Sequence, residues 1–120
     1  MPKPDTVEVL GVPLALTDYE RTMNWMDAII AANQRGYVIP AAVHAVMVAR
    51  EDRETRDAVL DSGALSVPDG QPLVWAMKLL GHRDASRVYG PELMARYCER
   101  AARTGTRMFL YGGRNQGALV

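Results

Sequence analysis

The fold is decided by one stretch of the sequence, ALSVPDGQPLVW, which covers residues 64–75. Its first four residues are mostly apolar and predict a buried strand, and Pro68-Asp69-Gly70 predicts an abrupt turn after that strand. Pro72 suits the first turn of a helix, which Gly81 then ends. The expected apolar face of this helix consists of Leu73, Val74, Met77 and Leu80. A strand, a tight turn and a helix in direct succession are typical of α/β proteins.

The same alternation extends along the rest of the chain. Residues 7–14 predict a short strand or hairpin, and Thr17 and Glu20 have the spacing of a capping box, with Thr17 as the cap of a helix that Gly36 ends. Further elements are expected at residues 37–39, 43–50, 52–60, 91–104 and 107–111. Such alternation predicts one domain over residues 1–120, a Rossmann-like three-layer α/β sandwich with a mostly parallel sheet.

The composition excludes several classes of protein. The chain has 120 residues, and its 14 Lys and Arg residues balance 14 Asp and Glu residues, which argues against a nucleic-acid module that relies on bulk basicity. The single cysteine, Cys98, cannot form an intramolecular disulfide, and the N-terminus lacks an apolar signal core. No apolar run approaches the ~18 residues of a membrane span, and no amphipathic basic helix is recognised. We therefore expect a cytoplasmic protein.

Asp69 is the first candidate for a catalytic residue. It follows a predicted buried strand and precedes a helix, whose positive end favours an ionised carboxylate. Such a carboxylate can act as a general base toward a hydroxyl group. The alternative is that Pro68-Asp69-Gly70 is simply good turn chemistry, and the local sequence alone favours that interpretation.

Arg87 is a candidate for binding a diphosphate. It precedes Gly90 and Pro91, where backbone N–H groups open a predicted helix, and a guanidinium beside a helix N-terminus suits a diphosphate. The alternative is a solvated surface arginine. His44, at the start of a helix directly after a strand, could face the same edge as Asp69 and bind a sugar hydroxyl, although a structural histidine is the commoner case.

Glycine-rich and metal-binding signals are weaker. Gly112 and Gly113 follow a predicted strand and resemble the start of a phosphate-binding turn, but neither the dinucleotide fingerprint nor a P-loop is present. This disfavours a nucleotide-dependent oxidoreductase. Two separated histidines and one cysteine do not form a metal-ligand pattern, so no metal site is expected.

Taken together, these segments resemble the WecG/TagA/CpsF family of bacterial glycosyltransferases. The resemblance runs from about Val9 to Gly113, and the order and spacing of its motifs make chance agreement improbable. The motifs that carry it are VHAVMVARED at 43–52, VPDGQPLVW at 67–75, RVYGPELM at 87–94, CERAA at 98–102 and FLYGG at 109–113.

This resemblance implies a metal-independent, inverting transferase that needs no cofactor. Its donor would be a UDP-sugar of the N-acetylmannosamine type. Its acceptor would be a polyprenyl-diphosphate-linked sugar at the inner face of the cytoplasmic membrane, where peripheral contact and self-association are further expectations. Asp69 takes the position of the family's proposed base, and Arg87 that of the residue thought to contact the diphosphate. His44, Gly70, Gly90, Gly112 and Gly113 complete the residues expected to bind the substrates.

The sequence also departs from the family pattern. Pro40-Ala41-Ala42 stands where many members carry a Thr and an Asn, and Glu92 stands where an Asp is usual. Family members continue well beyond the Gly-Gly turn, so we expect a sheet that is incomplete at the C-terminus. Two hypotheses follow: a UDP-sugar transferase or the N-terminal half of one, and a non-catalytic α/β module that binds a partner or self-associates.

Overall fold

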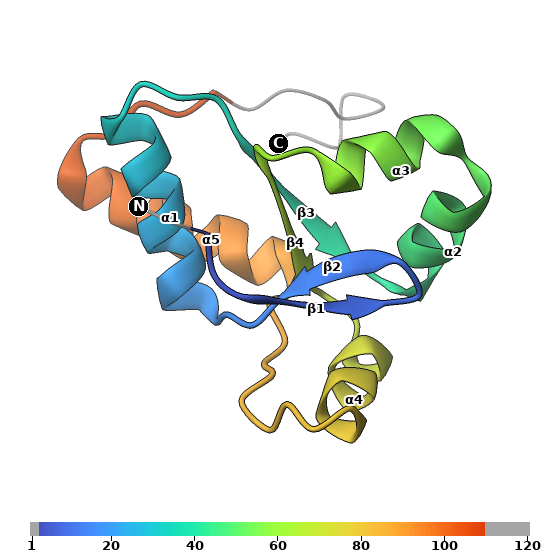
Figure 1. The fold of residues 1–120 in the computed structure, drawn as a ribbon. Helices are drawn as coiled ribbons and strands as arrows, with labels where there is room; N and C mark the ends of the chain where they lie inside the picture. Colours follow the sequence, from blue (N-terminus) through green and yellow to red (C-terminus); the bar gives the residue numbers. More distant parts are fainter. Residues whose placement is uncertain (1–2, 110–120) are drawn as a thin grey trace, which may run out of the picture.

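A β-hairpin opens the part of the chain that the computed structural model describes, residues 3–109 (Figure 1). Its strands, β1 (Thr6–Val9) and β2 (Val12–Ala15), pair antiparallel with Val7 opposite Leu14. Leu10 and Gly11 connect them, and both have positive φ angles, as a two-residue type I′ turn requires. The hairpin interpretation of residues 7–14 is therefore confirmed.

The sheet is mostly parallel. Both β2 and β3 (Tyr37–Ala41) run parallel to β4 (Ala64–Pro68), and the strand order is β1-β2-β4-β3. All five residues of the central strand β4 are buried, which explains its mostly apolar sequence. Among the strand pairs of residues 3–109, only β1 and β2 are antiparallel. The predicted α/β class with a mostly parallel, Rossmann-like sheet is confirmed.

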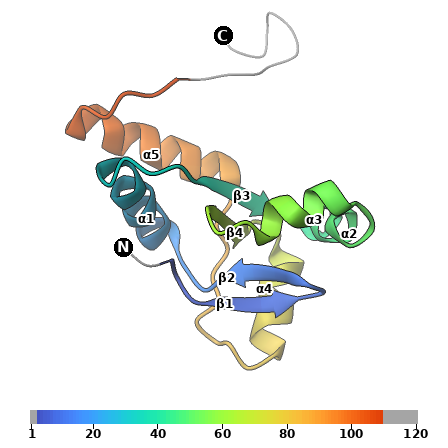
Figure 2. The ribbon, with the colours of Figure 1, turned by 45° about the horizontal axis from the view of Figure 1, so that its top comes forward.

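Helices cover both faces of this sheet (Figures 1 and 2). On one face, α1 (Tyr19–Ala31) and α5 (Gly90–Thr104) bury Met23, Leu93 and Tyr97 against Leu65 and Val67 of β4. The other face is covered by α2 (Val43–Glu51), α3 (Arg53–Leu60) and α4 (Gln71–Leu79). Among the described residues, no helix combines the length and the apolar character needed to cross a bilayer.

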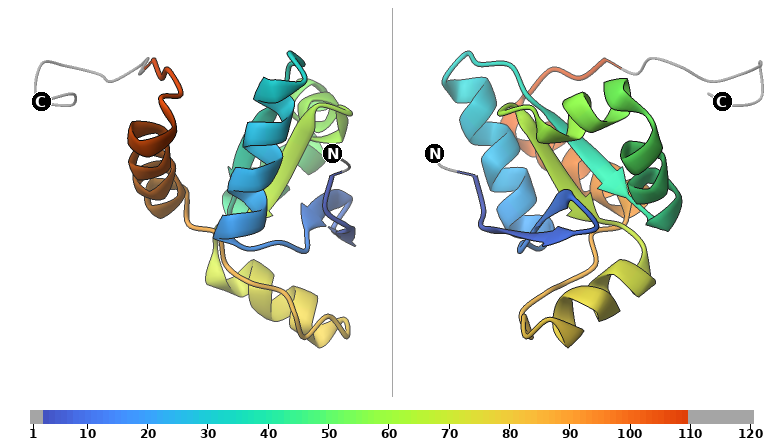
Figure 3. Two further views of the ribbon diagram at one scale, coloured as in Figure 1. Left: turned by 90° about the vertical axis from the view of Figure 1, so that its left-hand side faces the viewer. Right: turned by 45° about the vertical axis from the view of Figure 1, so that its right-hand side comes forward.

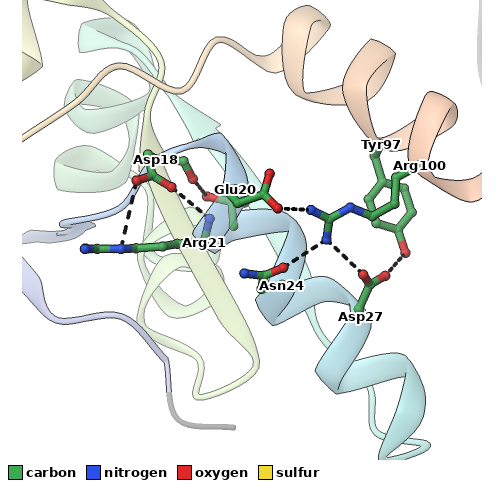
Figure 4. Close-up of polar contacts among 8 residues, drawn as sticks. Asp18, Glu20, Arg21, Asn24, Asp27, Tyr97 and Arg100 are labelled. Atoms are coloured by element: carbon green, nitrogen blue, oxygen red, sulfur yellow. Dashed lines mark hydrogen bonds and ion pairs between the residues drawn. The ribbon is translucent and has the colours of Figure 1, made fainter.

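A polar network joins α5 to α1 (Figure 4). The Arg100 guanidinium donates to Glu20 Oε1 at 2.6 Å, and to Asn24 Oδ1 and Asp27 Oδ2 at 3.0 Å each. The Tyr97 hydroxyl donates to the other oxygen of Asp27 at 2.8 Å. Burial, together with the hydrogen bond to Asp27, raises the pKa of Tyr97 to about 12. The network fixes where α5 lies on α1.

The N-terminal cap and the end of α1 differ from the sequence-based prediction. The cap is Asp18, whose side chain accepts the Arg21 N–H at 2.8 Å. Thr17 is instead buried, and its hydroxyl pairs with that of Thr22 at 3.2 Å. Asn33, with a φ of 54°, turns the chain just after Ala31, so the helix ends before Gly36.

The predicted strand over residues 107–111 is wrong for its described part. Residues 107–109 adopt no strand, and Phe109 is exposed. A segment with strand-forming residues becomes a strand only when it pairs with a neighbour, and residues 107–109 pair with none of the four described strands. Residues 110 and 111 lie outside the described part of the chain.

The buried faces of α4 and α5 are narrower than the distribution of their apolar residues suggests. On α5, Leu93, Tyr97 and Ala101 are buried, but Met94, Cys98 and Ala102 are exposed. On α4, Leu73, Val74 and Met77 are buried, whereas Leu80 lies beyond the helix end and is exposed. Each helix has a neighbour on only one side among the described elements, so one narrow stripe is buried.

Candidate active site

The candidate site lies where β3 and β4 end side by side. Ala41 pairs with Pro68 at the last position of the ladder, and the residues after both strands therefore share one edge of the sheet. The Asp69 N–H donates to the Ala41 carbonyl oxygen at 2.9 Å, which ties the turn after β4 to the end of β3. The Pro68-Asp69-Gly70 turn is thus a fixed part of this edge.

The Asp69 carboxylate contacts the N-terminus of α5. Its Oδ2 accepts the N–H of Gly90, the first residue of α5, at 3.0 Å. The sequence suggested an effect of the helix that follows Asp69, which is α4, but the hydrogen bond comes from a helix that begins 21 residues later. The positive end of α5 stabilises a negative charge at this position.

Gly90 is needed for this close approach. A Cβ atom at Gly90 would lie 3.1 Å from Pro40 Cγ and 3.3 Å from Asp69 Oδ2, tighter than most side-chain contacts. Gly70 is different, since a Cβ there would only touch Ala42 at an ordinary distance of 3.6 Å. Of these two predicted binding residues, Gly90 is the one whose lack of a side chain shapes the site.

Arg87 lies over the same turn. Its Nε donates to the Asp69 carbonyl oxygen at 2.5 Å, and its guanidinium carbon lies 4.6 Å from the centre of the Tyr89 ring. The next residue, Val88, donates its N–H to the Pro68 carbonyl oxygen at 2.8 Å, which anchors the loop. Within residues 3–109, the two terminal nitrogens of Arg87 form no hydrogen bond and remain available to an anion.

The structure gives less information about the remaining predicted site residues. His44 lies in the first turn of α2, at the edge where β3 ends, and it is exposed. It forms no hydrogen bond to Asp69 in the structure as described from residue 3 to residue 109. Gly112 and Gly113 lie outside the described residues. The structure thus brings together Asp69, Arg87 and Gly90, with His44 on the same edge.

Sequence reasoning did not identify one feature of this edge, the meeting of three helix N-termini. Helices α2, α4 and α5 all begin there, with Ala42, Gly70 and Tyr89 as their N-caps. None of these caps makes a side-chain hydrogen bond to its helix. Open N-terminal N–H groups favour anions, and phosphate groups are common ligands of such helix ends. The sequence feature that could have revealed these open helix ends is the lack of a polar side chain at the N-cap positions Ala42 and Gly70.

The comparison with known protein families decides the class of protein. Residues 7–119 match the model of the glycosyl transferase WecG/TagA/CpsF family. The chain belongs to this family. Its members are glycosyltransferases that use UDP-sugars in the synthesis of cell-surface polysaccharides, so a sugar donor and an acceptor are its substrates. No curated protein matches the chain.

The geometry suits this chemistry. Glycosyl transfer from a UDP-sugar needs a group that accepts a proton from the acceptor hydroxyl and groups that stabilise the leaving diphosphate. In the described part of the chain, this edge contains the Asp69 carboxylate, the Arg87 guanidinium and the N-termini of α2, α4 and α5. Among residues 3–109, no group of three His, Cys, Asp or Glu side chains could hold a metal ion.

Proposed function

We propose that this chain carries the catalytic edge of an inverting transferase that moves an N-acetylmannosamine-type sugar from a UDP donor. The acceptor in this proposal is a polyprenyl-diphosphate-linked sugar at the inner face of the cytoplasmic membrane. One observation supports the proposal above the others: hydrogen bonds gather Asp69, Arg87 and the α5 N-terminus around one turn. The family supplies the identity of the donor class.

In the proposed mechanism, Asp69 is the general base. Its Oδ2 is held by the Gly90 N–H, which leaves Oδ1 to take the proton of the acceptor hydroxyl. The acceptor oxygen then bonds to the anomeric carbon as the bond from that carbon to the UDP oxygen breaks. Attack on the face opposite UDP inverts the anomeric configuration.

Arg87 and the helix N-termini stabilise the leaving UDP. Negative charge grows on the diphosphate as its bond to the sugar breaks, and a guanidinium binds such a group through two parallel N–H···O bonds. The Nε of Arg87 is already engaged by the Asp69 carbonyl oxygen, so the terminal nitrogens make these contacts. In this proposal they take the charge-stabilising task that a metal ion performs in many other transferases.

The test is release of UDP from UDP-N-acetylmannosamine in the presence of a lipid-linked acceptor. Asp69→Asn keeps an oxygen for the Gly90 N–H but removes the base, so release should fall by at least a hundredfold. Asp57→Asn, at an exposed position on α3, is the matched control and should keep full activity. Equal release by Asp69→Asn and the wild type would refute the role of Asp69. A folded wild type that releases no UDP would favour the non-catalytic module.

A further inference from the structure

An exposed apolar surface lies at the far end of α4 and in the loop after it. Trp75, Leu79 and Leu80 expose 62%, 89% and 59% of their areas. Trp75 and Leu79 are four residues apart and share the outward face of the helix, while Leu73, Val74 and Met77 face the sheet. Figure 3 shows α4 at one end of the molecule, away from the other helices. We call Trp75, Leu79, Leu80, Lys78 and Arg83 the α4 surface.

The charge around this surface is positive. Residues 75–84 contain two basic residues, Lys78 and Arg83, against one acidic residue, Asp84, in a chain that is neutral overall. Lys78 and Arg83 are both exposed, and each lies within three residues of Leu80 in the sequence. An exposed tryptophan with leucines and flanking Lys or Arg is the composition that proteins use at the interface of an anionic membrane.

The same charge disfavours a second copy of the chain as the occupant. A dimer about a two-fold axis places each surface against the same surface of the other copy, so two surfaces that both carry Lys78 and Arg83 would meet. An anionic lipid surface offers the opposite charge and an apolar layer beneath it. Charge complementarity therefore selects the lipid.

The α4 surface and the candidate site share one rigid element. Helix α4 begins two residues after Asp69 and ends at Leu79, and nine residues of helix span about 13 Å. We propose that the α4 surface docks on the headgroups of an anionic bilayer and keeps Asp69 within about this distance of the membrane surface. The inference rests on the proposed function for its purpose, because a lipid-linked acceptor has to reach Asp69 from the membrane.

The first experiment measures binding of the 120-residue chain to vesicles of phosphatidylcholine with 30% phosphatidylglycerol. Trp75 is exposed and Trp25 is buried, so the emission of Trp75 should shift to the blue on docking while Trp25 gives a constant background. The double variant Leu79→Ser/Leu80→Ser should bind at least tenfold more weakly. Its control is Ile30→Ser/Leu60→Ser, which alters two residues that are each 55% exposed elsewhere.

A second pair of variants tests the charge. Lys78→Gln/Arg83→Gln should weaken binding roughly twenty-five-fold, since each basic residue near an anionic surface contributes about a fivefold factor. Arg53→Gln/Arg103→Gln removes two exposed charges elsewhere and should bind like the wild type. Equal losses in the α4 variants and their controls would overturn the proposal. So would a wild-type dimer that Leu79→Ser/Leu80→Ser converts to monomer, because a second copy would then occupy the surface.

The two proposals fail separately. Vesicle binding is measured without any nucleotide sugar, and Asp69→Asn should bind vesicles as the wild type does. Vesicle binding that the α4 variants weaken, in a protein that releases no UDP, would support the membrane-docking proposal and refute the transferase proposal. Sugar transfer to a water-soluble acceptor analogue with release of UDP, but without vesicle binding, would support the transferase proposal and overturn the membrane-docking proposal.

Discussion

Replacing Arg100 with Met removes the charged group that joins α5 to α1. The Arg100 side chain is only 14% exposed and donates to Glu20, Asn24 and Asp27. Hydrogen bonds to charged groups are each worth about 1.5–3 kcal/mol, but the Glu20 and Asp27 side chains are 70% and 41% exposed, so water recovers much of this. We therefore expect a loss of about 2 kcal/mol in the free energy of unfolding.

Thermal and urea denaturation followed by circular dichroism measure this loss. At roughly 2.1 cal/mol/K of unfolding entropy per residue, 2 kcal/mol lowers the Tm of a 120-residue chain by about 8 °C. Arg103→Met is the matched control, because Arg103 is exposed on the same helix and should lower the Tm by no more than about 2 °C. Equal shifts for Arg100→Met and Arg103→Met would refute the view that the network holds α5 in place.

Three further predictions follow from single contacts. Gly90→Ala crowds Pro40 and Asp69, so UDP release should fall at least tenfold while the Tm falls by only a few degrees; unchanged release would show that the Gly90 contact is not needed. The raised pKa of Tyr97 means that the folded chain keeps this proton while the unfolded chain loses it, so stability should fall as pH rises from about 10 to about 12. Tyr97→Phe should lose this dependence, and absorbance at 295 nm should lose its step near pH 12; an unchanged titration would contradict the assignment. Asp18→Ala should lower the free energy of unfolding by about 1 kcal/mol, whereas Asp18→Asn should lower it hardly at all, because Asn also caps helices. Equal losses for the two variants would argue against Asp18 as the cap.

Local patterns were sufficient to predict most of the fold. Gly11 next to a short apolar run specifies the hairpin turn, and Pro68-Asp69-Gly70 specifies the end of β4, because turn chemistry acts over a few neighbouring residues. Caps are harder to predict, since Thr17 and Asp18 both suit an N-cap and the burial of Thr17 decides between them. The strand expected at 107–111 depends on a partner strand, which no local pattern contains.

The candidate site was predicted as a set of residues but not as an arrangement. Asp69 and Arg87 stood out only through the family resemblance, because a turn aspartate and a surface arginine are each common. The bond between Asp69 and Gly90 joins residues 21 positions apart, and the three helix N-termini meet only when β3 and β4 are side by side. Chain topology, rather than any local motif, creates this concentration of anion-binding groups.

The hydrogen bonds at this edge allow the proposed roles of Asp69 and Arg87 to be tested separately by mutation. Arg87 donates to the main-chain oxygen of Asp69, and the Asp69 carboxylate accepts from the main-chain N–H of Gly90. Neither side chain therefore depends on the other side chain for its position. A substitution of Asp69 leaves the anchor of Arg87 intact, and a substitution of Arg87 leaves the carboxylate at the α5 N-terminus. In the proposed mechanism, loss of proton acceptance and loss of diphosphate binding should therefore be separable effects, the first on kcat and the second on the KM for the UDP-sugar as well.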